Sequence, residues 1–259
     1  MKKISWSLRK YAFVLMTSIV VSGPAIGQAC TEYQSLTKEE AASAALGKVI
    51  KETKAVGLSV AVVKDGKIIY SGAFGYKDYD NNELLKEDNI FRIASISKSF
   101  TATAVMQLVS KGKLSLDTDV SDILGFTVRN PKYPNVVITI RRLLSHTSSL
   151  NDSEGCFDLD VANPAKSVHF FRAYNDYAPG EKYEYCNLGF NMLGAAVEKA
   201  SGMRFDNYIK KNIIVPLGLY AGFNPDSLDR SRFATIFEYN AEKDAFTAQP
   251  TAYRSRAEE

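Results

Sequence analysis

Histidine is scarce in this chain of 259 residues, which contains only His146 and His169. Neither lies at a spacing that groups it with cysteines or carboxylates, the other common ligands of protein metal sites. The sequence therefore predicts no metal site, and no motif in it requires a cofactor. Basic clusters interleaved with aromatic residues are also absent, so nothing indicates a nucleic-acid partner.

The N-terminal region lacks an apolar run of membrane-spanning length. Its apolar stretch, 11–21, is shorter than the roughly 20 residues that a helix needs to cross a bilayer. It follows four basic residues and no acidic one, and small residues come just before Gln28, the layout of a cleaved signal peptide. We therefore expect residues 1–27 to direct export to the periplasm or the medium. Cys30 suggests a lipid anchor as the alternative, although glycine precedes it where lipoprotein signals usually carry leucine.

A net excess of positive or negative charge is also nearly absent once this segment is set aside. The whole chain carries a net charge of +3, and subtracting the four positive charges of the N-terminal segment leaves −1 for residues 28–259. Hydrophobic residues make up 46% of the chain, and no repeat or low-complexity linker interrupts it. We therefore expect residues 28–259 to form one domain with a sizeable core. Membrane contact is expected only through the signal peptide or a lipid at Cys30.

Cysteine occurs three times, an odd count for an exported protein. If Cys30 lies at or near the processed terminus, Cys156 and Cys186 remain. An oxidising compartment permits a disulfide between these two, which would close a loop of about 30 residues. Two buried free thiols are the alternative, and the count alone does not decide between them.

The order of helix and strand signals indicates an α+β or α/β protein. A helix is expected after Thr37, which stands in capping-box spacing with Glu40. Two β-rich runs around Asp65-Gly66 predict a hairpin over 57–75. Further helices are expected at about 95–111 and 188–201, with a second hairpin in 232–249.

A serine three positions before a lysine is the first chemical candidate, but the pattern occurs four times, and its context must separate the copies. The pairs are Ser7/Lys10, Ser35/Lys38, Ser95/Lys98 and Ser110/Lys113. The first, second and fourth lie in charged or polar stretches that explain them as surface residues. Only Ser95 and Lys98 stand at the start of an apolar helical pattern, where residues three apart share a face.

That placement suits nucleophilic catalysis. A serine hydroxyl becomes a good nucleophile when a base takes its proton, and a buried lysine can be such a base. The positive end of the helix dipole would favour an oxyanion formed there. A serine cap beside a surface lysine is the structural alternative, and spacing alone favours it.

A tyrosine two positions before an asparagine is the second candidate, and it occurs three times. Two copies, Tyr79/Asn81 and Tyr133/Asn135, lie in surface turns, whereas Tyr185/Asn187 directly precedes an apolar helix. A tyrosine in that position can relay a proton, and an asparagine amide can both donate to and accept from a substrate amide.

Four ordered segments together carry a family resemblance. They are residues 91–124 "FRIASISKSFTATAVMQLVSKGKLSLDTDVSDIL", 138–150 "ITIRRLLSHTSSL", 179–194 "PGEKYEYCNLGFNMLG" and 213–219 "IIVPLGL". In this order they resemble the serine hydrolase family that includes class C β-lactamases, D-alanyl-D-alanine carboxypeptidases, penicillin-binding-type esterases and D-aminopeptidases. The resemblance runs from about residue 40 to the end. It implies a β-lactamase/transpeptidase-like fold, in which an antiparallel sheet flanked by helices adjoins a mainly helical region.

The resemblance also implies roles for single residues. Ser95 matches the acylated serine, and Lys98 matches the lysine that helps to deprotonate it. Tyr185 matches the tyrosine that shuttles a proton to the leaving group, and Asn187 matches the asparagine that holds the substrate. His146 is expected to be structural and His169 incidental. The position of Cys186 beside Tyr185 favours the disulfide with Cys156, as a brace for this loop.

One family motif is missing. A Lys-Thr-Gly segment or a His/Lys-x-Gly variant, expected on a sheet strand near the C-terminus, does not occur after Asn187, and the Lys-x-Gly at 64–66 is the hairpin turn. We therefore expect a member truncated at its C-terminus, with sheet strands missing, and low activity for the chain as it stands.

The sequence thus predicts an exported serine hydrolase that cleaves an amide or ester bond through an acyl-enzyme. Its substrate is expected to be a β-lactam, a D-Ala-D-Ala peptide of the peptidoglycan type, or an ester. The alternative is a penicillin-binding-type protein that captures a cell-wall peptide or another ligand without turnover. Retention of the serine, the lysine and the tyrosine together favours the enzyme, because binding alone does not need a proton-transfer set.

Overall fold

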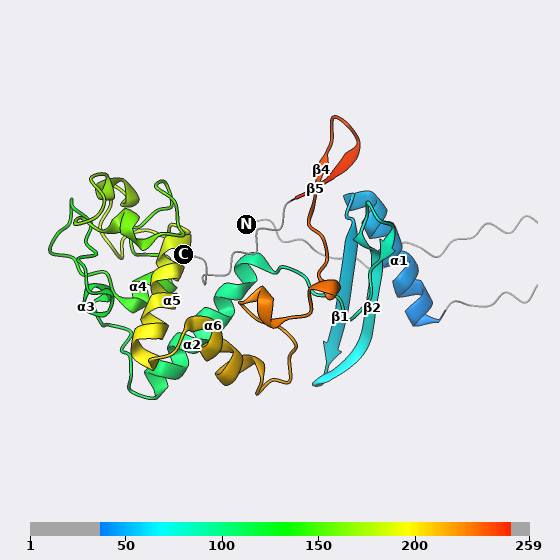
Figure 1. Cartoon of the computed structure of the whole chain (residues 1–259), viewed down its shortest axis with the longest axis horizontal. Helices are drawn as coiled ribbons and strands as arrows, with labels where there is room; N and C mark the ends of the chain where they lie inside the picture. The colour runs from blue at the N-terminus through cyan, green and yellow to red at the C-terminus, as the bar shows by residue number, and fades with distance from the viewer. Residues whose placement is uncertain (1–36, 250–259) are drawn as a thin grey trace, which may run out of the picture.

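A computed structural model describes residues 37–249 of the chain (Figure 1). The predicted signal peptide and Cys30 lie outside the described residues. Within 37–249, no helix is long and apolar enough to cross a membrane.

The first described helix, α1 (Lys38–Thr53), begins as the sequence predicts. Thr37 accepts a hydrogen bond from the backbone N–H of Glu40, and the Glu40 carboxylate accepts one from the backbone N–H of Thr37. This capping box satisfies two N–H groups that have no partner within the helix. The helix ends at Lys54, which adopts the left-handed conformation with φ of 52°.

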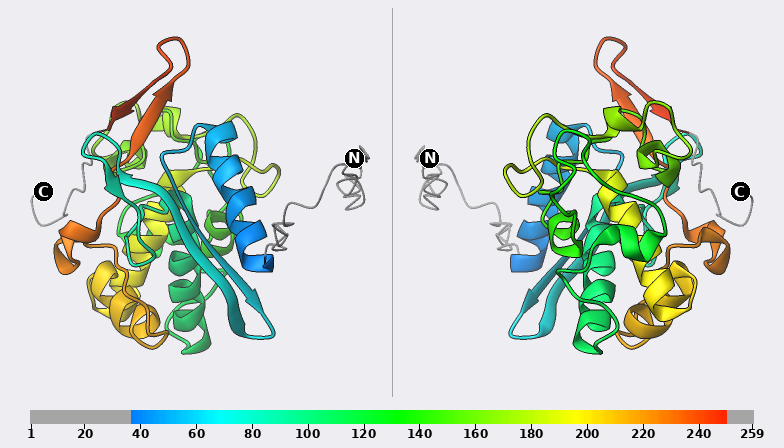
Figure 2. Two further views of the ribbon diagram at one scale, coloured as in Figure 1. Left: turned by 90° about the vertical axis from the view of Figure 1, so that its right-hand side faces the viewer. Right: turned by 90° about the vertical axis from the view of Figure 1, so that its left-hand side faces the viewer.

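The predicted hairpin consists of β1 (Gly57–Lys64) and β2 (Lys67–Asp78), which pair antiparallel. Asp65 and Gly66 have φ of 52° and 71°, the two positive values that a tight two-residue hairpin turn requires. The short β3 (Glu83–Leu84) extends the sheet on the β2 side, so the order is β1-β2-β3. Helix α1 lies along the hairpin (Figure 2), where Ser43 Oγ is 3.0 Å from the hydroxyl oxygen of Tyr70.

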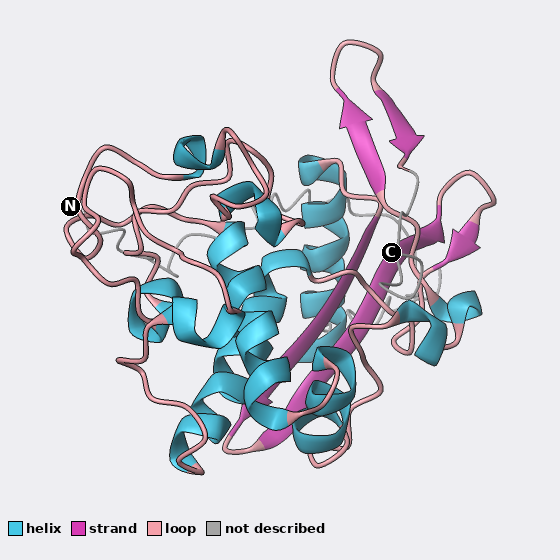
Figure 3. Cartoon of the chain, turned by 60° about the vertical axis from the view of Figure 1, so that its left-hand side comes forward, coloured by secondary structure: helices cyan, strands magenta, loops and turns pink. Residues whose placement is uncertain are grey.

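A mainly helical region occupies the other side of the molecule (Figures 1 and 3). Its helices are α2 (Lys98–Ser110), α3 (Val120–Leu124), α4 (Ile140–Leu144), α5 (Asn187–Ser201) and α6 (Phe205–Ile209), which a π-helical turn, Lys210–Ile214, continues. Short 3₁₀ segments cover Ala94–Ser97, Leu159–Ala162, Phe170–Ala173, Pro225–Ser227 and Arg230–Arg232. The buried core lies in this region and includes Leu108, Leu143, Leu188, Met192 and Leu193.

The chain returns to the first sheet after the helical region. Thr235 donates its backbone N–H to Lys77 at 2.9 Å, and the Lys77 ammonium donates to the carbonyl of Ser231 at 2.9 Å. The second predicted hairpin follows as β4 (Phe237–Asn240) and β5 (Ala245–Ala248), a separate two-stranded sheet. Within residues 37–249, β1 thus remains an edge strand. The fold has antiparallel sheets beside a helical region, as predicted.

Candidate active site

The start of α2 brings Ser95 and Lys98 onto one face. Ser95 lies in the 3₁₀ segment Ala94–Ser97, which runs directly into α2 at Lys98. Because a 3₁₀ turn has three residues, residues three apart face the same way. The Lys98 ammonium donates a hydrogen bond to Ser95 Oγ at 3.3 Å, and Ser95 itself is exposed.

The backbone just before the serine is unusual. Ala94 has φ of 43°, in the left-handed region that residues with a Cβ seldom adopt. Such conformations cost about 1–3 kcal/mol and gather at functional sites. Ser95 follows this residue directly and lies in the turn before α2, where its hydroxyl contacts Tyr185 from the loop before α5.

That loop supplies Tyr185 and Asn187, as the sequence predicts. Cys186 caps α5, so Tyr185 lies just outside the helix and Asn187 is its first residue. The Tyr185 hydroxyl donates to Ser95 Oγ at 2.6 Å. The Lys98 ammonium donates to Asn187 Oδ1 at 2.6 Å. The structure therefore brings together all four predicted residues, from segments about 90 positions apart.

Aromatic rings surround the lysine. Lys98 Nζ lies 4.9 Å from the centre of the Tyr185 ring and 5.5 Å from that of Phe190. His146 stacks at a tilt against both rings, with centroid distances of 4.6 and 5.0 Å. The negative faces of such rings attract an ammonium group, which helps to keep Lys98 beside Ser95.

His146 is a structural element of the turn after α4, as expected. Its φ is 55°, and its Nδ1 accepts a hydrogen bond from the backbone N–H of Cys186 at 3.1 Å. Burial lowers the pKa of His146, and the nearby Lys98 charge lowers it further. A neutral ring with a free lone pair on Nδ1 suits this contact. His169 is exposed and packs edge-on against Phe171.

Tyr185 has the electrostatic character of a proton-transfer group. Hydrogen bonding to Lys98 and to Ser95 holds the pKa of the Tyr185 hydroxyl below its usual value. Both neighbours stabilise the tyrosinate, the form that can accept a proton from Ser95. The arrangement can therefore carry a proton away from the serine hydroxyl at a pH where an ordinary tyrosine would not.

Asp152, in the loop after α4, is a member of this site that the sequence did not reveal. Its carboxylate accepts from the backbone N–H groups of Asn187 and Leu188, each at 2.9 Å, and from Asn187 Nδ2 at 2.7 Å. Burial would raise the pKa of Asp152, but these hydrogen bonds outweigh it and hold the pKa below its usual value. A partner 35 positions away leaves no local pattern in the sequence.

The predicted disulfide is wrong in this structure, where Cys156 and Cys186 are both free thiols. Cys186 is buried, and its Sγ donates to Asp152 Oδ1 at 3.3 Å and accepts from the backbone N–H of Gly189 at 3.4 Å. The thiol therefore serves as the cap of α5 instead of bonding to Cys156. Burial raises the pKa of the Cys186 thiol to about 12.

Metal ligands do not gather anywhere in the described part of the chain. Between residues 37 and 249, no group of three or more His, Cys, Asp or Glu side chains could hold a metal ion.

Comparison with known proteins finds a matching family and several relatives. The family model described as Beta-lactamase matches residues 40–256. Penicillin-binding protein 4* of Bacillus subtilis (strain 168) is 30% identical over 198 residues, which are 71% of this chain and 43% of that protein. Esterase EstB of Burkholderia gladioli is 31% identical over 211 residues, which are 75% of this chain and 53% of that protein.

A solved structure is similar as well. The octameric penicillin-binding protein homologue from Pyrococcus abyssi superimposes with a TM-score of 0.66 at 29% identity, covering 83% of this chain and 51% of that one. The chain thus spans about half the length of the proteins it matches.

Proposed function

Since the chain belongs to the Beta-lactamase family, we propose that it is a serine hydrolase that cleaves an ester or amide bond through an acyl-enzyme on Ser95. In the β-lactamase/transpeptidase-like fold, Ser95 lies in the 3₁₀ turn before α2 and contacts the loop before α5 through Tyr185. One observation carries the proposal: Ser95 Oγ receives hydrogen bonds from both Tyr185, at 2.6 Å, and Lys98, at 3.3 Å. Binding without turnover would not require two proton-transfer groups on one hydroxyl.

The first half of the proposed reaction forms the acyl-enzyme. In the resting arrangement both Tyr185 and Lys98 donate to Ser95, so one of them must lose a proton before it can accept. Tyr185 is the better candidate because its pKa is lowered, and Lys98 helps by stabilising the tyrosinate. Ser95 Oγ then bonds to the carbonyl carbon while its proton passes to Tyr185. The helix start favours the oxyanion that forms.

The second half returns the serine. Tyr185 gives its proton to the leaving alcohol or amine, which departs and leaves Ser95 acylated. Water then attacks the acyl carbon, Tyr185 takes the proton of that water, and breakage of the bond to Oγ releases the acid as Ser95 recovers its proton. Each step needs a donor or acceptor within hydrogen-bond reach of Oγ, which Tyr185 provides.

Asn187 has a narrower role than its amide would permit in isolation. Its Oδ1 is held by Lys98 and one of its two N–H bonds points to Asp152, so one N–H remains for a substrate. We therefore expect Asn187 to donate to a carbonyl oxygen of the substrate. The relatives suggest esters and β-lactams as substrates to test, with a D-Ala-D-Ala peptide as the third.

The same proposal includes export. It rests on the basic and apolar pattern of residues 1–27 and places the protein in the periplasm or outside the cell.

Turnover of a p-nitrophenyl ester and of a chromogenic cephalosporin tests the proposal. Ser95→Ala should abolish both, whereas Ser110→Ala, in a second Ser-x-x-Lys pair, should change neither, because Ser110 Oγ bonds only to the carbonyl of Gln107 within α2. Covalent labelling by penicillin without turnover would favour the ligand-capturing alternative. Turnover that survives Ser95→Ala would contradict the proposal.

A further inference from the structure

Asp152 connects the loop after α4 to the hydrogen-bond network around the serine. Its carboxylate accepts from Asn187 Nδ2 at 2.7 Å, Asn187 Oδ1 accepts from Lys98 Nζ at 2.6 Å, and Lys98 Nζ reaches Ser95 Oγ at 3.3 Å. These three contacts form one continuous line from a half-buried carboxylate to the exposed hydroxyl. Nothing in the proposed reaction uses Asp152 directly.

The chemistry of this line fixes the direction in which the Asn187 amide points. An amide turned by 180° would set Oδ1 against the Asp152 carboxylate, where two acceptors repel. It would also set the NH₂ group against the Lys98 ammonium, where two donors repel. Asp152, as a group that can only accept when ionised, therefore selects the orientation in which Oδ1 faces Lys98. Hydrogen bonds keep the pKa of Asp152 low, so the carboxylate stays ionised at neutral pH.

We propose that Asp152 is a positioning residue for the proposed hydrolase: it holds Asn187 so that the amide oxygen keeps Lys98 against Ser95. The inference rests on the proposed function for its consequence, because a correctly held ammonium matters only if Ser95 reacts. A small misplacement of a reacting group can cost about a hundredfold in rate. Asp152 also leaves Asn187 with one N–H that points to neither partner and can meet the substrate.

A purely structural role is the competing explanation. Asp152 accepts the backbone N–H groups of Asn187 and Leu188, so it also caps the first turn of α5. A cap alone would affect the stability of the fold and leave the pH dependence of the serine unchanged. A positioning residue must alter the reactivity of Ser95 in protein that is still folded.

Asp152→Asn separates the two explanations, with Asp158→Asn as the matched control. The new amide has one acceptor oxygen in place of two, so it cannot accept from Asn187 and from the backbone N–H of Leu188 together, and without the charge its hold on the Asn187 amide is weaker. Asp158 lies in the same loop, where it caps the 3₁₀ segment Leu159–Ala162 by accepting from the backbone N–H of Asp160 at 2.9 Å, and it is not one of the residues in the line from Asp152 to Ser95. Asparagine caps as well as aspartate, so this control changes the charge alone.

The rate of Ser95 labelling by a fluorophosphonate, measured from pH 5 to 10, is the first readout. We expect Asp152→Asn to label about tenfold to a hundredfold more slowly and Asp158→Asn to match the unsubstituted protein. The acid limb of the profile should also move to higher pH in Asp152→Asn, because a displaced Lys98 no longer lowers the pKa of Tyr185, and this loss outweighs the smaller opposite effect of removing the Asp152 charge. The titratable groups around Asp152 are Lys98 on α2, His146 after α4, Cys156 in its own loop, and Tyr185 and Cys186 before α5.

Unfolding by urea completes this comparison. An unchanged labelling rate and an unchanged profile in folded Asp152→Asn would overturn the inference, and so would a slower rate that merely follows a loss of folded protein. Failure of the unsubstituted protein to label would instead count against the proposed function.

A second readout needs no catalysis. In protein labelled with ¹⁵N on asparagine side chains, the Asn187 signals are identified by their loss in Asn187→Asp. One Nδ2 proton should exchange slowly with solvent, and it should exchange faster in Asp152→Asn. Substitution of Lys98 by Met should shift the same signals, because it removes the partner of Oδ1. If the shifts and exchange rates of the Asn187 signals are unchanged by both substitutions, the inference is overturned even if Ser95 does not react.

Discussion

Lys98 Nζ lies 2.6 Å from Asn187 Oδ1, although 89 positions separate the two residues in the chain. This bond joins the first turn of α2 to the first turn of α5. It fixes the ammonium between the hydroxyl of Ser95 and the rings of Tyr185 and Phe190. In the proposed reaction, Ser95 therefore depends on contacts that both helices supply.

Replacing Lys98 should lower the rate at which Ser95 reacts. Lys98→Ala removes the donor to Ser95 and the charge that lowers the pKa of Tyr185. We expect the rate of fluorophosphonate labelling to fall by at least about a hundredfold, the usual size of a general acid–base contribution.

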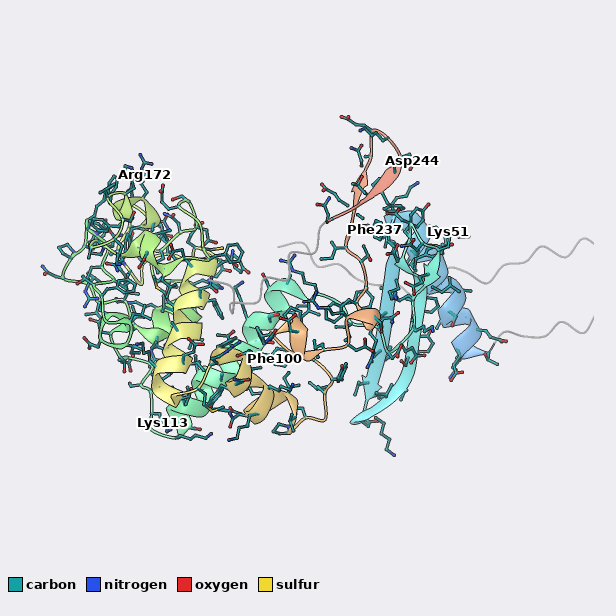
Figure 4. The ribbon with its side chains drawn as sticks, viewed as in Figure 1. Lys51, Phe100, Lys113, Arg172, Phe237 and Asp244 are labelled. Carbon is teal, nitrogen blue, oxygen red and sulfur yellow. The ribbon has the colours of Figure 1, made fainter. Side chains whose placement is uncertain are left out.

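Lys113→Ala is the control for that change. Lys113 follows Ser110 at the same spacing. It lies just beyond the C-terminal end of α2, whereas Phe100 lies in the first turn of α2, at the end that carries Lys98 (Figure 4). Equal losses in the two variants would show that the effect is not specific to the site.

Tyr185→Phe should remove the proton acceptor and keep the ring. Because hydrogen bonding to Lys98 and to Ser95 lowers the pKa of Tyr185, the tyrosinate is the reactive form and activity should rise with pH through that lowered pKa. In Tyr185→Phe this limb should vanish, and ester turnover should fall by roughly 10² to 10⁴.

Tyr183→Phe is the matched control, since Tyr183 is exposed and its ring packs in a T-shaped arrangement with the His146 ring. Its pH–rate profile should coincide with that of the unsubstituted protein. A limb that persists in Tyr185→Phe would assign the titration to another group.

The sequence predicted elements whose signals are local. The capping box of α1 and the Asp65-Gly66 turn are written in neighbouring residues, and the structure confirms both. The left-handed Gly202 ends α5 where it was expected, with φ of 70°. In each case the backbone conformation follows from residues within one turn of one another.

The site itself could be predicted only through resemblance. Spacing alone favoured a serine cap at Ser95, and four ordered segments changed that interpretation; the family assignment is confirmed. Contacts between residues far apart in the chain could not be predicted from the sequence, because the contact between Asp152 and Asn187 depends on how the loop after α4 packs against α5. The predicted disulfide was wrong for the same reason, since the number of cysteines does not show that Cys186 is hydrogen-bonded to Asp152 and Gly189.

Free thiols should therefore be found at both inner cysteines. In a Cys30→Ser variant, unfolded without reductant, a thiol reagent should react with two groups per chain. In folded protein Cys156 should react first, because Cys186 is buried and its thiol has a pKa of about 12. No reactive thiol in the unfolded, unreduced variant would contradict the structure.

Stability in the helical region should depend on Asp119. It caps α3 by accepting from Ser121 at 2.9 Å and pairs with Arg129. Burial alone would raise the pKa of Asp119, but the bonds to Arg129 and Ser121 hold it below its usual value. Asp119→Ala should lower the free energy of unfolding by about 1–2 kcal/mol at pH 7.

The pH dependence of this effect has a definite sign. A lowered carboxylate pKa stabilises the fold above the pKa of the unfolded chain, and the contribution disappears as the pH falls through the lowered value. Urea unfolding at pH 7 and in acid should thus show the two proteins converging in acid. Asp117→Ala, which removes an exposed pair with Arg141, should have a smaller effect. A difference that grows in acid would contradict the assignment.

The acyl-enzyme is the central claim, and mass spectrometry of the intact protein tests it most directly. The protein is mixed with a penicillin or a p-nitrophenyl ester, quenched in acid within seconds and digested for peptide mapping. The account predicts one acyl group per chain, located on Ser95 and absent from Ser95→Ala. An adduct on any other residue, or the same adduct in Ser95→Ala, would contradict it.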